Sequence, residues 1–390
     1  MSKRGKIFYG WWLVAGLFIV GMLGPMARFG MSAFFPFISA EFGWSRSTIG
    51  LGQSLTLWIY AILVLLSGRM VDRIGSRKTI FLGGFLCFGG WLLFSTIRFP
   101  WQLYLYYGFI MALAVTMTHY VPIQATVRKW FIKRAGFVIA ITTAASSIGM
   151  ATLIPLLTTM SSSLGWRNTS IICAFGAGTI IMLLAFFVIR NTPESMGLIP
   201  DGEGSTPVLN IRPKAIEESW SIQEAIRMPQ LWLLFTAYGM AALPHMGIIA
   251  HLVMWGVDLG SSTATAGIFI TATNLSSVIT RLGGGWFGDK YGKRRILLIG
   301  NLLCLVIMLW AWRGVHSTQS LMIFSVLIGV GCGLPIALYS AYLGDLFGRA
   351  NIGFLFSIVT MGFGLIGGLG PVIWGEIFEI SGSYNPTCLV

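Results

Sequence analysis

Long apolar runs separated by short polar segments fill the sequence from residue 9 to residue 377. A helix needs about 20 predominantly apolar residues to cross a lipid bilayer, within a range of about 17–25. Eleven segments satisfy this requirement, so the pattern predicts eleven transmembrane helices. They cover residues 9–35, 49–67, 79–97, 103–126, 135–160, 169–188, 230–257, 265–287, 296–312, 320–343 and 352–377.

The one long polar stretch, residues 191–229, follows the sixth apolar segment and is rich in proline, glycine and charge. It predicts a cytoplasmic linker between two bundles. The N-terminal bundle then covers residues 1–190 with helices 1–6, and the C-terminal bundle covers residues 230–390 with helices 7–11. Inside the linker, "SIQE" at residues 221–224 matches a capping box, which predicts the start of a short interfacial helix.

The composition supports a membrane protein and gives no sign of an enzyme. Of 390 residues, 55% are hydrophobic and only 10% are charged, whereas soluble domains carry about 25% charged residues. The sequence contains no ATP-binding loop, zinc-protease motif or nucleophile elbow, so we expect no catalysis and no cofactor. Single cysteines without metal-ligand spacing are interpreted as packing residues. They are Cys87, Cys173, Cys304, Cys332 and Cys388.

The placement of the basic residues predicts the orientation of the chain in the membrane. With the N-terminus in the cytoplasm, 20 of the 26 lysines and arginines fall in inner segments and 4 in outer loops. Cytoplasmic loops of membrane proteins carry such an excess. We therefore expect a protein of the cell membrane (inner or plasma membrane) whose positive charge meets anionic lipids at the cytoplasmic face, and no binding of nucleic acid. The two remaining cations, Arg28 and Arg281, lie inside apolar segments.

A charged phrase occurs twice, 217 residues apart, each time at the inner end of the second helix of a bundle. Gly68, Asp72, Arg73, Gly75 and Arg77 match Gly285, Asp289, Lys290, Gly292 and Arg294. A second echo links "FIKRAGF" (131–137) with "FGRANIGF" (347–354). Repeats of this kind are the signature of many transporters. The alternative is a basic loop that only orients the chain.

The spacing of the repeated phrase suits a gate. Glycines permit tight turns and close approach of backbones. A carboxylate can bind the N-terminus of a helix from the opposite bundle for about 0.3–1 kcal/mol, which is weak enough to break in every cycle. The predicted gate residues are Gly68, Asp72, Arg73, Arg134, Gly285, Asp289 and Lys290.

The doubled phrase G-x-x-x-D-[RK]-x-G resembles the signature of the major facilitator superfamily. More narrowly, "YGWW", "YVPIQATVRKWFIKRAGFVIA" and "NTPESMGLIPDG" are similar to monocarboxylate transporters and oxalate/formate antiporters. The resemblance implies an all-α polytopic membrane protein with the major facilitator fold, made of two pseudo-symmetric six-helix bundles. Because only eleven helices are predicted, we expect the twelfth helix to be missing from this chain.

Arg281 is the leading candidate for substrate binding. A charge within a membrane span costs about 2.5–3.5 kcal/mol on insertion scales, so it usually has a task. Arg281 lies eight residues before Asp289, which places it about 12 Å from the inner helix end. The guanidinium fork suits a carboxylate, although a structural partner or local water is the alternative. In the resembled families, an arginine on this helix holds the substrate carboxylate.

Other candidate substrate ligands come from the residues themselves or from the resemblance. Asn274 lies seven residues before Arg281, on about the same helix face. Tyr120 falls where the resembled families place a substrate-contacting tyrosine, and His119 adjoins it. Ser277 stands where monocarboxylate carriers have an aspartate. Arg28 attracts anions or snorkels outward.

A second departure from the resembled families concerns the charge of the substrate. The oxalate carriers have a lysine on helix 11, and the matching position here is Phe363.

The sequence therefore predicts a secondary transporter that moves a small organic monocarboxylate, such as lactate or pyruvate, by alternating access. Because all 13 acidic residues lie in loops or near helix ends, proton coupling would use His119, His245, His251 or the protonated substrate. One alternative is an oxalate/formate-type anion exchanger. Another is a transporter-like receptor that binds a carboxylate without translocating it.

Overall fold

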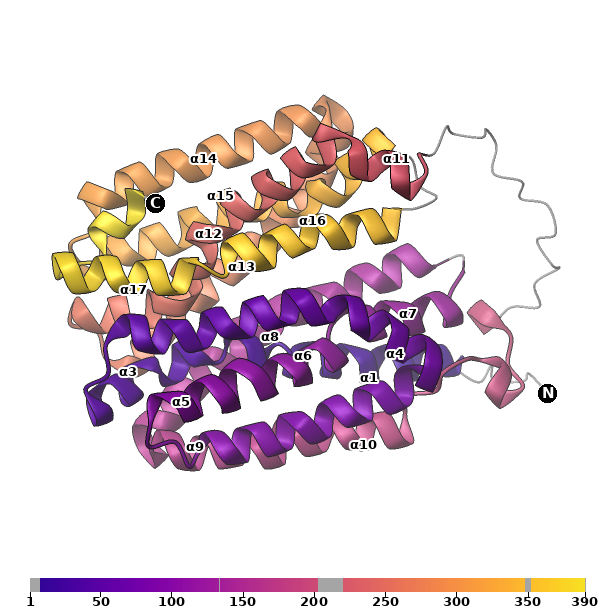
Figure 1. Cartoon of the computed structure of the whole chain (residues 1–390), viewed down its shortest axis with the longest axis horizontal. Helices are drawn as coiled ribbons and strands as arrows, with labels where there is room; N and C mark the ends of the chain where they lie inside the picture. Colours follow the sequence, from indigo (N-terminus) through magenta and orange to yellow (C-terminus); the bar gives the residue numbers. More distant parts are fainter. Residues whose placement is uncertain (1–7, 133, 203–219, 348–351, 390) are drawn as a thin grey trace, which may run out of the picture.

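The computed structural model describes residues 8–132, 134–202, 220–347 and 352–389, which are almost entirely helical. Two helical bundles lie side by side with their long axes roughly parallel (Figure 1). One bundle contains α1 to α10 and the other α12 to α17. The described segments therefore form an all-α protein with one bundle from each half of the sequence.

The N-terminal bundle contains six membrane-length passes, several of which are interrupted. The first consists of α1 (Tyr9–Leu23), α2 (Met26–Phe29) and α3 (Met31–Phe42). The second and third lie in α4 (Arg46–Phe94). The fourth consists of α5 (Pro100–Leu103), a π-helix (Tyr104–Met111), α6 (Ala112–Thr118) and α7 (Tyr120–Trp130). The last two are α8 (Ala135–Leu164) and α9 (Trp166–Cys173), which continues through a π-turn into α10 (Thr179–Phe187).

The C-terminal bundle follows the linker. It contains the short α11 (Ile222–Arg227), then α12 (Pro229–Asp258), α13 (Thr263–Tyr291), α14 (Lys293–Gly314), α15 (Thr318–Phe347), α16 (Ile352–Gly367) and α17 (Gly370–Ser381). The predicted capping box is confirmed: the Ser221 hydroxyl accepts from the Glu224 amide, and the Glu224 carboxylate accepts from the Ser221 amide at 3.0 Å. The Ser221 hydroxyl also donates to the Glu224 carboxylate at 2.7 Å, and this bond, together with the one from the Ser221 amide, lowers the pKa of the Glu224 carboxyl.

Ten helices in the described residues are long and apolar enough to cross a membrane. They correspond to ten of the eleven predicted segments. The eleventh, at residues 265–287, lies inside the 29-residue helix α13, which carries Arg281 and ends in the charged phrase. The polar residues of α13 therefore lower its apolar character without shortening it.

The expected break between the second and third helices is smaller than the sequence indicated. The segments 49–67 and 79–97 are joined in one continuous assignment, α4, and only Gly75 leaves the helical conformation (φ 82°, ψ 156°). Its counterpart in the second copy, Gly292, has φ 93° and ψ 125° and separates α13 from α14. Gly75 and Gly292 therefore make the turns expected of glycines in the repeated phrase, since positive φ is readily available to glycine, whereas Gly68 stays helical within α4.

Alanine at these two glycines should have unequal effects. A Cβ at Gly75 would lie 2.5 Å from the side chain of Asn191, whereas a Cβ at Gly292 would meet open space. Gly292→Ala should therefore cost about 1–2 kcal/mol, from the left-handed backbone alone, and Gly75→Ala should cost more. Thermal unfolding in detergent measures both. Gly89→Ala, at a helical glycine with nothing nearby, is the control, and equal losses at positions 75 and 292 would contradict the prediction.

Close glycine contacts place α13 against α15. A Cβ at Gly333 would lie 2.3 Å from the Thr280 hydroxyl, and one at Gly329 would lie 2.2 Å from the carbonyl oxygen of Thr273. Small residues allow helix backbones in membranes to approach this closely. The packing fixes the face of α13 on which Ser277 and Arg281 lie.

Candidate substrate-binding site

Arg281 lies on α13 and reaches across to the other bundle. Its Nη1 donates a hydrogen bond to the Ser147 hydroxyl on α8 at 3.0 Å. Its Nε is buried and has no partner among the described residues. Ser277, one turn earlier and 2% exposed, likewise has a buried hydroxyl without a partner in the described ranges. The pair thus offers unused polar groups one helical turn apart, and Arg281 contacts the opposite bundle.

Arg28 lies in α2, the short helix between two interruptions of the first pass. Its side chain is 4% exposed, so the expectation of outward snorkelling is wrong. The guanidinium lies 4.5 Å from the ring centroid of Tyr60, 4.9 Å from that of Phe29 and 5.8 Å from that of Phe363. Its Nε and Nη2 are buried without a described partner. Aromatic faces attract the cation, but they do not neutralise it.

His119 and Tyr120 lie where the fourth pass breaks between α6 and α7. His119 leaves the helical conformation (φ −107°, ψ −142°), and its ring centroid lies 3.8 Å from that of Tyr120. The imidazole is 3% exposed, and neither ring nitrogen has a hydrogen-bond partner in the described part of the chain. Tyr60 contacts both this ring, at 6.4 Å, and Arg28. His119 and Arg28 therefore share a neighbour.

Of the remaining candidate side chains, some already make hydrogen bonds within the protein and one has a ring nitrogen that does not. The Asn274 amide nitrogen donates to the Ile270 carbonyl at 2.9 Å, within its own helix. His251 is bonded at both ring nitrogens, to the Tyr384 hydroxyl at 2.9 Å and to the Pro371 carbonyl at 2.7 Å. His245, in contrast, has a buried Nδ1 with no described partner. His251 is thus a structural histidine, whereas His245 remains available.

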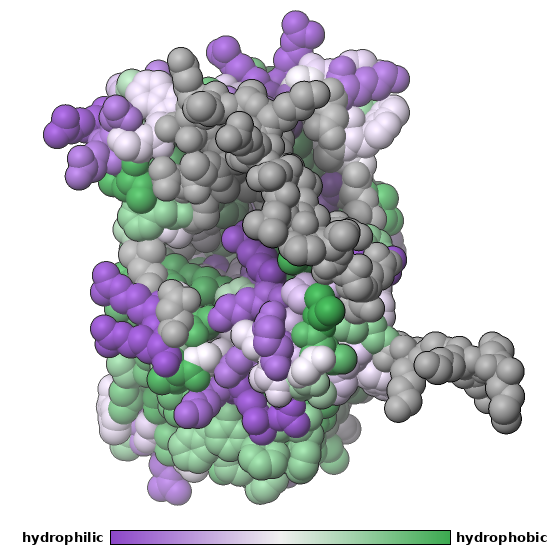
Figure 2. Space-filling view, turned by 90° about the vertical axis from the view of Figure 1, so that its right-hand side faces the viewer, coloured by the Kyte–Doolittle hydropathy of each residue, from purple (hydrophilic) through white to green (hydrophobic). Residues whose placement is uncertain are grey.

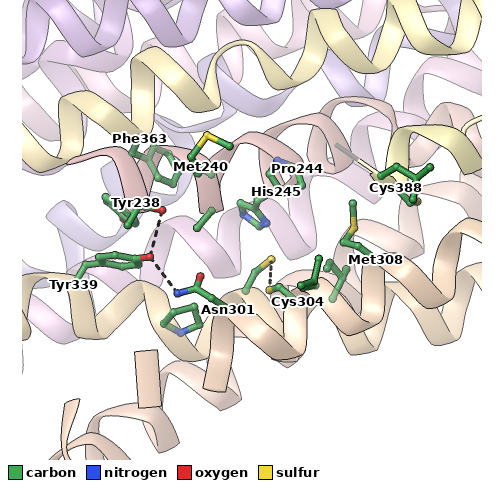
Figure 3. Close-up of a pocket in the computed structure, with 18 residues that line it drawn as sticks. Tyr238, Met240, Pro244, His245, Asn301, Cys304, Met308, Tyr339, Phe363 and Cys388 are labelled. Carbon is green, nitrogen blue, oxygen red and sulfur yellow. Dashed lines mark hydrogen bonds between the residues drawn. The ribbon is translucent and has the colours of Figure 1, made fainter. Parts of the chain in front are cut away.

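A cavity of about 390 Å³ lies inside the C-terminal bundle (Figure 3). Residues of α12, α14, α15 and α16 and of the C-terminal 3-10 turn (Asn385–Leu389) line it, and they include Tyr238, His245 and Phe363 but not Arg281 or Tyr120. The cavity nevertheless adjoins Arg28, because Phe363 lines it and the Phe363 ring centroid lies 5.8 Å from the Arg28 guanidinium. This cavity could not be predicted from the sequence, because most of its lining residues belong to ordinary apolar helical segments.

At the end of the molecule that carries the repeated loops, hydrophilic side chains gather over both bundles (Figure 2). The predicted gate residues Arg73 and Arg134 are exposed there. Lys290 is also exposed, and its ammonium lies 4.9 Å from the Trp286 ring centroid. A Cβ at Gly68 would meet nothing within 4 Å. The remaining predicted gate residues, Asp72, Gly285 and Asp289, lie outside the set whose side-chain positions are described.

At the opposite end, a polar cluster joins the two bundles. Arg46 donates to both carboxylate oxygens of Asp258, at 2.5 and 2.8 Å, and to the Tyr384 hydroxyl at 2.7 Å. Its guanidinium lies 3.5 Å from the Phe378 ring centroid. The Ser47 amide donates to Glu379 at 2.7 Å. We call this cluster the latch, and define it as Arg46, Ser47, Asp258, Phe378, Glu379 and Tyr384.

The latch is the main contact between the bundles that sequence reasoning missed. Arg46 counted only as one of the outer-loop cations, and a contact with a residue 212 positions away leaves no local signal. In the described ranges, the other hydrogen bonds between the bundles join residues nearer the middle: Trp58 with Leu365, Thr271 with Ala151, and Arg281 with Ser147. The bundles are therefore closed together at the latch end.

Two repeated helical bundles with cations at their interface define a polytopic membrane protein of the transporter type. The family model for the Major Facilitator Superfamily matches residues 17–260 and 234–387, and the chain belongs to this superfamily. The family and the similar proteins are transporters rather than enzymes.

Several curated proteins are similar over most of the chain. The oxalate:formate antiporter of Oxalobacter formigenes is 24% identical over 324 residues, covering 80% of this chain and 74% of that protein. Monocarboxylate transporter 12 of Xenopus laevis is 23% identical over 411 residues, covering 98% and 85%. The MFS-type transporter pynF of Aspergillus niger is 23% identical over 338 residues, covering 86% and 74%. The resemblance inferred from the motifs is thus confirmed.

Solved structures support the same fold. A bacterial homolog of the human lysosomal transporter Spinster, in an inward-facing and unoccupied conformation, superposes with a TM-score of 0.77 at 18% identity, covering 96% of this chain and 84% of that one. The nucleoside transporter NupG gives a TM-score of 0.74 at 15% identity, covering 97% and 95%. The predicted all-α major facilitator fold is confirmed.

Proposed function

We propose that this protein is a secondary transporter that moves a small organic monocarboxylate, such as lactate or pyruvate, with Arg281 holding the carboxylate. The observation that carries the proposal is the position of Arg281 between the bundles, with a buried Nε unpaired in the described residues and Nη1 held only by a serine hydroxyl. A guanidinium in such a site recognises a planar anion through two parallel hydrogen bonds. Ser277 and Tyr120 are the neighbouring candidates.

Alternating access supplies the transport step in this proposal. The latch keeps one end closed, and the repeated loops form the gate at the other. The excess of basic residues on the loop side favours placing that side in the cytoplasm, so the described conformation would face inward. Breaking the latch and closing the loops would then expose Arg281 to the other side.

Uptake into proteoliposomes tests the proposal against its rivals. A symporter accumulates labelled monocarboxylate when a pH gradient is imposed. An oxalate/formate-type exchanger, a rival favoured by the similar antiporter, accumulates it only against internal anion. A receptor binds without accumulation under either condition. The proposal would be contradicted if the proteoliposomes accumulated a solute of another class and neither accumulated nor bound any carboxylate.

The gate assignment rests on the repeated phrase. Asp72→Asn and Asp289→Asn should slow transport several-fold and leave substrate affinity nearly unchanged, because each removes a gate contact worth about 0.3–1 kcal/mol and lies away from Arg281. Uptake rates and equilibrium binding measure the two quantities separately. Loss of binding in a folded variant would remove these aspartates from the gate.

The structure sharpens the expectation for proton coupling. His119 and His245 carry ring nitrogens without described partners, whereas both nitrogens of His251 are bonded. Replacing His119 and His245 together by glutamine should abolish uphill uptake driven by a pH gradient if a histidine carries the proton. His251→Gln should instead lower stability. Unchanged uptake in the double variant would leave co-movement of the protonated substrate as the mechanism.

A further inference from the structure

We propose that Arg28 and His119 form a second anion subsite, separate from Arg281, that takes one small anionic group. The group is either a free anion such as chloride, bound beside a monocarboxylate substrate, or a second carboxylate, in which case the substrate is a dicarboxylate rather than a monocarboxylate. The subsite lies in the N-terminal bundle and next to the cavity of the C-terminal bundle. It extends the proposed function without depending on the role of Arg281.

The first argument is electrostatic. Arg28 is 4% exposed, and its Nε and Nη2 have no hydrogen-bond partner among the described residues. A buried charge without a partner is strongly unfavourable. Its cation–π contacts with Tyr60 and Phe29 return only about 0.5–2 kcal/mol. A bound anion supplies both the opposite charge and the acceptors that these donors lack.

The second argument is the environment of the guanidinium. The neighbouring His119 is also buried, and its two ring nitrogens are unpaired within the described chain. Tyr60 lies 4.5 Å from the Arg28 guanidinium and 6.4 Å from the His119 ring, so one aromatic side chain is a neighbour of both groups. Two buried polar side chains without partners, from separate passes of one bundle, indicate a built site rather than a packing accident.

Access to the subsite comes through Phe363. Its ring centroid lies 5.8 Å from the Arg28 guanidinium, and the same residue lines the 390 Å³ cavity. The guanidinium therefore approaches the edge of the cavity from the opposite bundle, against the ring of Phe363. Two bound anionic groups would then be neutralised from both bundles, one by Arg28 and the other by Arg281.

The test measures thermal stability and binding of the whole chain in detergent. In a buffer whose only anion is a bulky sulfonate, chloride or acetate should raise the unfolding temperature of the wild type and saturate. Arg28→Met should remove this response and should itself unfold at or above the wild-type temperature in the anion-poor buffer, because the unpaired charge is gone. Arg98→Met, at an exposed loop arginine, is the matched control. A wild type without any anion response overturns the subsite, and so does an unchanged response in Arg28→Met.

Two binding series identify the source of the anionic group. If the group belongs to the substrate, a dicarboxylate should bind roughly tenfold to a hundredfold tighter than the monocarboxylate of equal length, and Arg28→Met should erase this difference. If it is a free anion, chloride should bind with the same Arg28 dependence and the two carboxylates should be equal. His119→Gln should weaken either ligand. The subsite is overturned if the dicarboxylate shows no preference and chloride shows no binding that depends on Arg28. If monocarboxylate binding still depends on Arg281 in that case, the proposed function stands.

Discussion

Arg281→Ala is expected to lower carboxylate affinity by more than a hundredfold, and Arg281→Lys by roughly tenfold to a hundredfold. A charge-assisted hydrogen bond contributes about 1.5–3 kcal/mol, and each 1.4 kcal/mol is a tenfold change in affinity. Lysine keeps the charge but has no planar fork, so the second parallel bond is lost. Alanine leaves the anion unpaired in a site of low dielectric. Isothermal titration of the purified variants measures both losses.

Ser147→Ala is the matched control for Arg281. It removes the described partner of Nη1 but leaves the guanidinium, so affinity should fall little or should rise because a donor is freed. The amide analogue of the substrate should bind weakly to the wild type and should lose little in the Arg281 variants. Wild-type affinity in a folded Arg281→Ala protein would reject the assignment of Arg281.

The fold was predictable because its cues are local. Runs of about 20 apolar residues specify spans without reference to the rest of the chain, and the matched Gly75 and Gly292 adopt the positive φ that their repeated phrases suggest. The same locality explains the error at residues 68–78. A polar loop and a polar helical turn have the same composition, and α4 continues through this segment except at Gly75.

The candidate site was only partly predictable, since its chemistry depends on contacts between distant passes. Arg28 and Arg281 stand out in the sequence as charges within apolar segments. Nothing local shows that Phe363 stacks near Arg28 or that Ser147 holds Arg281. His251 and His245 likewise look alike in the sequence, and only the bonds of His251 to Tyr384 and Pro371 separate them.

Breaking the latch should shift the molecule toward a conformation open at that end. Arg46 and Asp258 form a two-point ion pair whose side chains are 13% and 27% exposed, so solvent screens it only in part. Truncating one partner of such a cross-interface pair costs about 2–5 kcal/mol when the pair is buried, and we expect the lower end here. Asp258→Asn should therefore raise the fraction of latch-open molecules by about tenfold or more.

A cysteine placed within the latch reports this opening. Ser47 is 8% exposed, and in a Ser47→Cys background the rate of maleimide labelling at position 47 should rise by about tenfold when Asp258→Asn is added. Exchanging the charges, with Arg46→Asp and Asp258→Arg together, should restore slow labelling. Arg167→Gln is the control, since Arg167 pairs with Glu41 inside the N-terminal bundle and does not join the two bundles.

The labelling experiment also shows whether the latch controls which end of the molecule is open or only stabilises the fold. If the latch only stabilised the fold, Asp258→Asn and Arg167→Gln would lower the unfolding temperature similarly and neither would change labelling at position 47 under native conditions. If the latch sets which end is open, only Asp258→Asn accelerates labelling, and a carboxylate that binds the latch-closed conformation more tightly slows it again. Equal labelling in all variants would mean that the bundles are held together at this end by apolar packing rather than by Arg46.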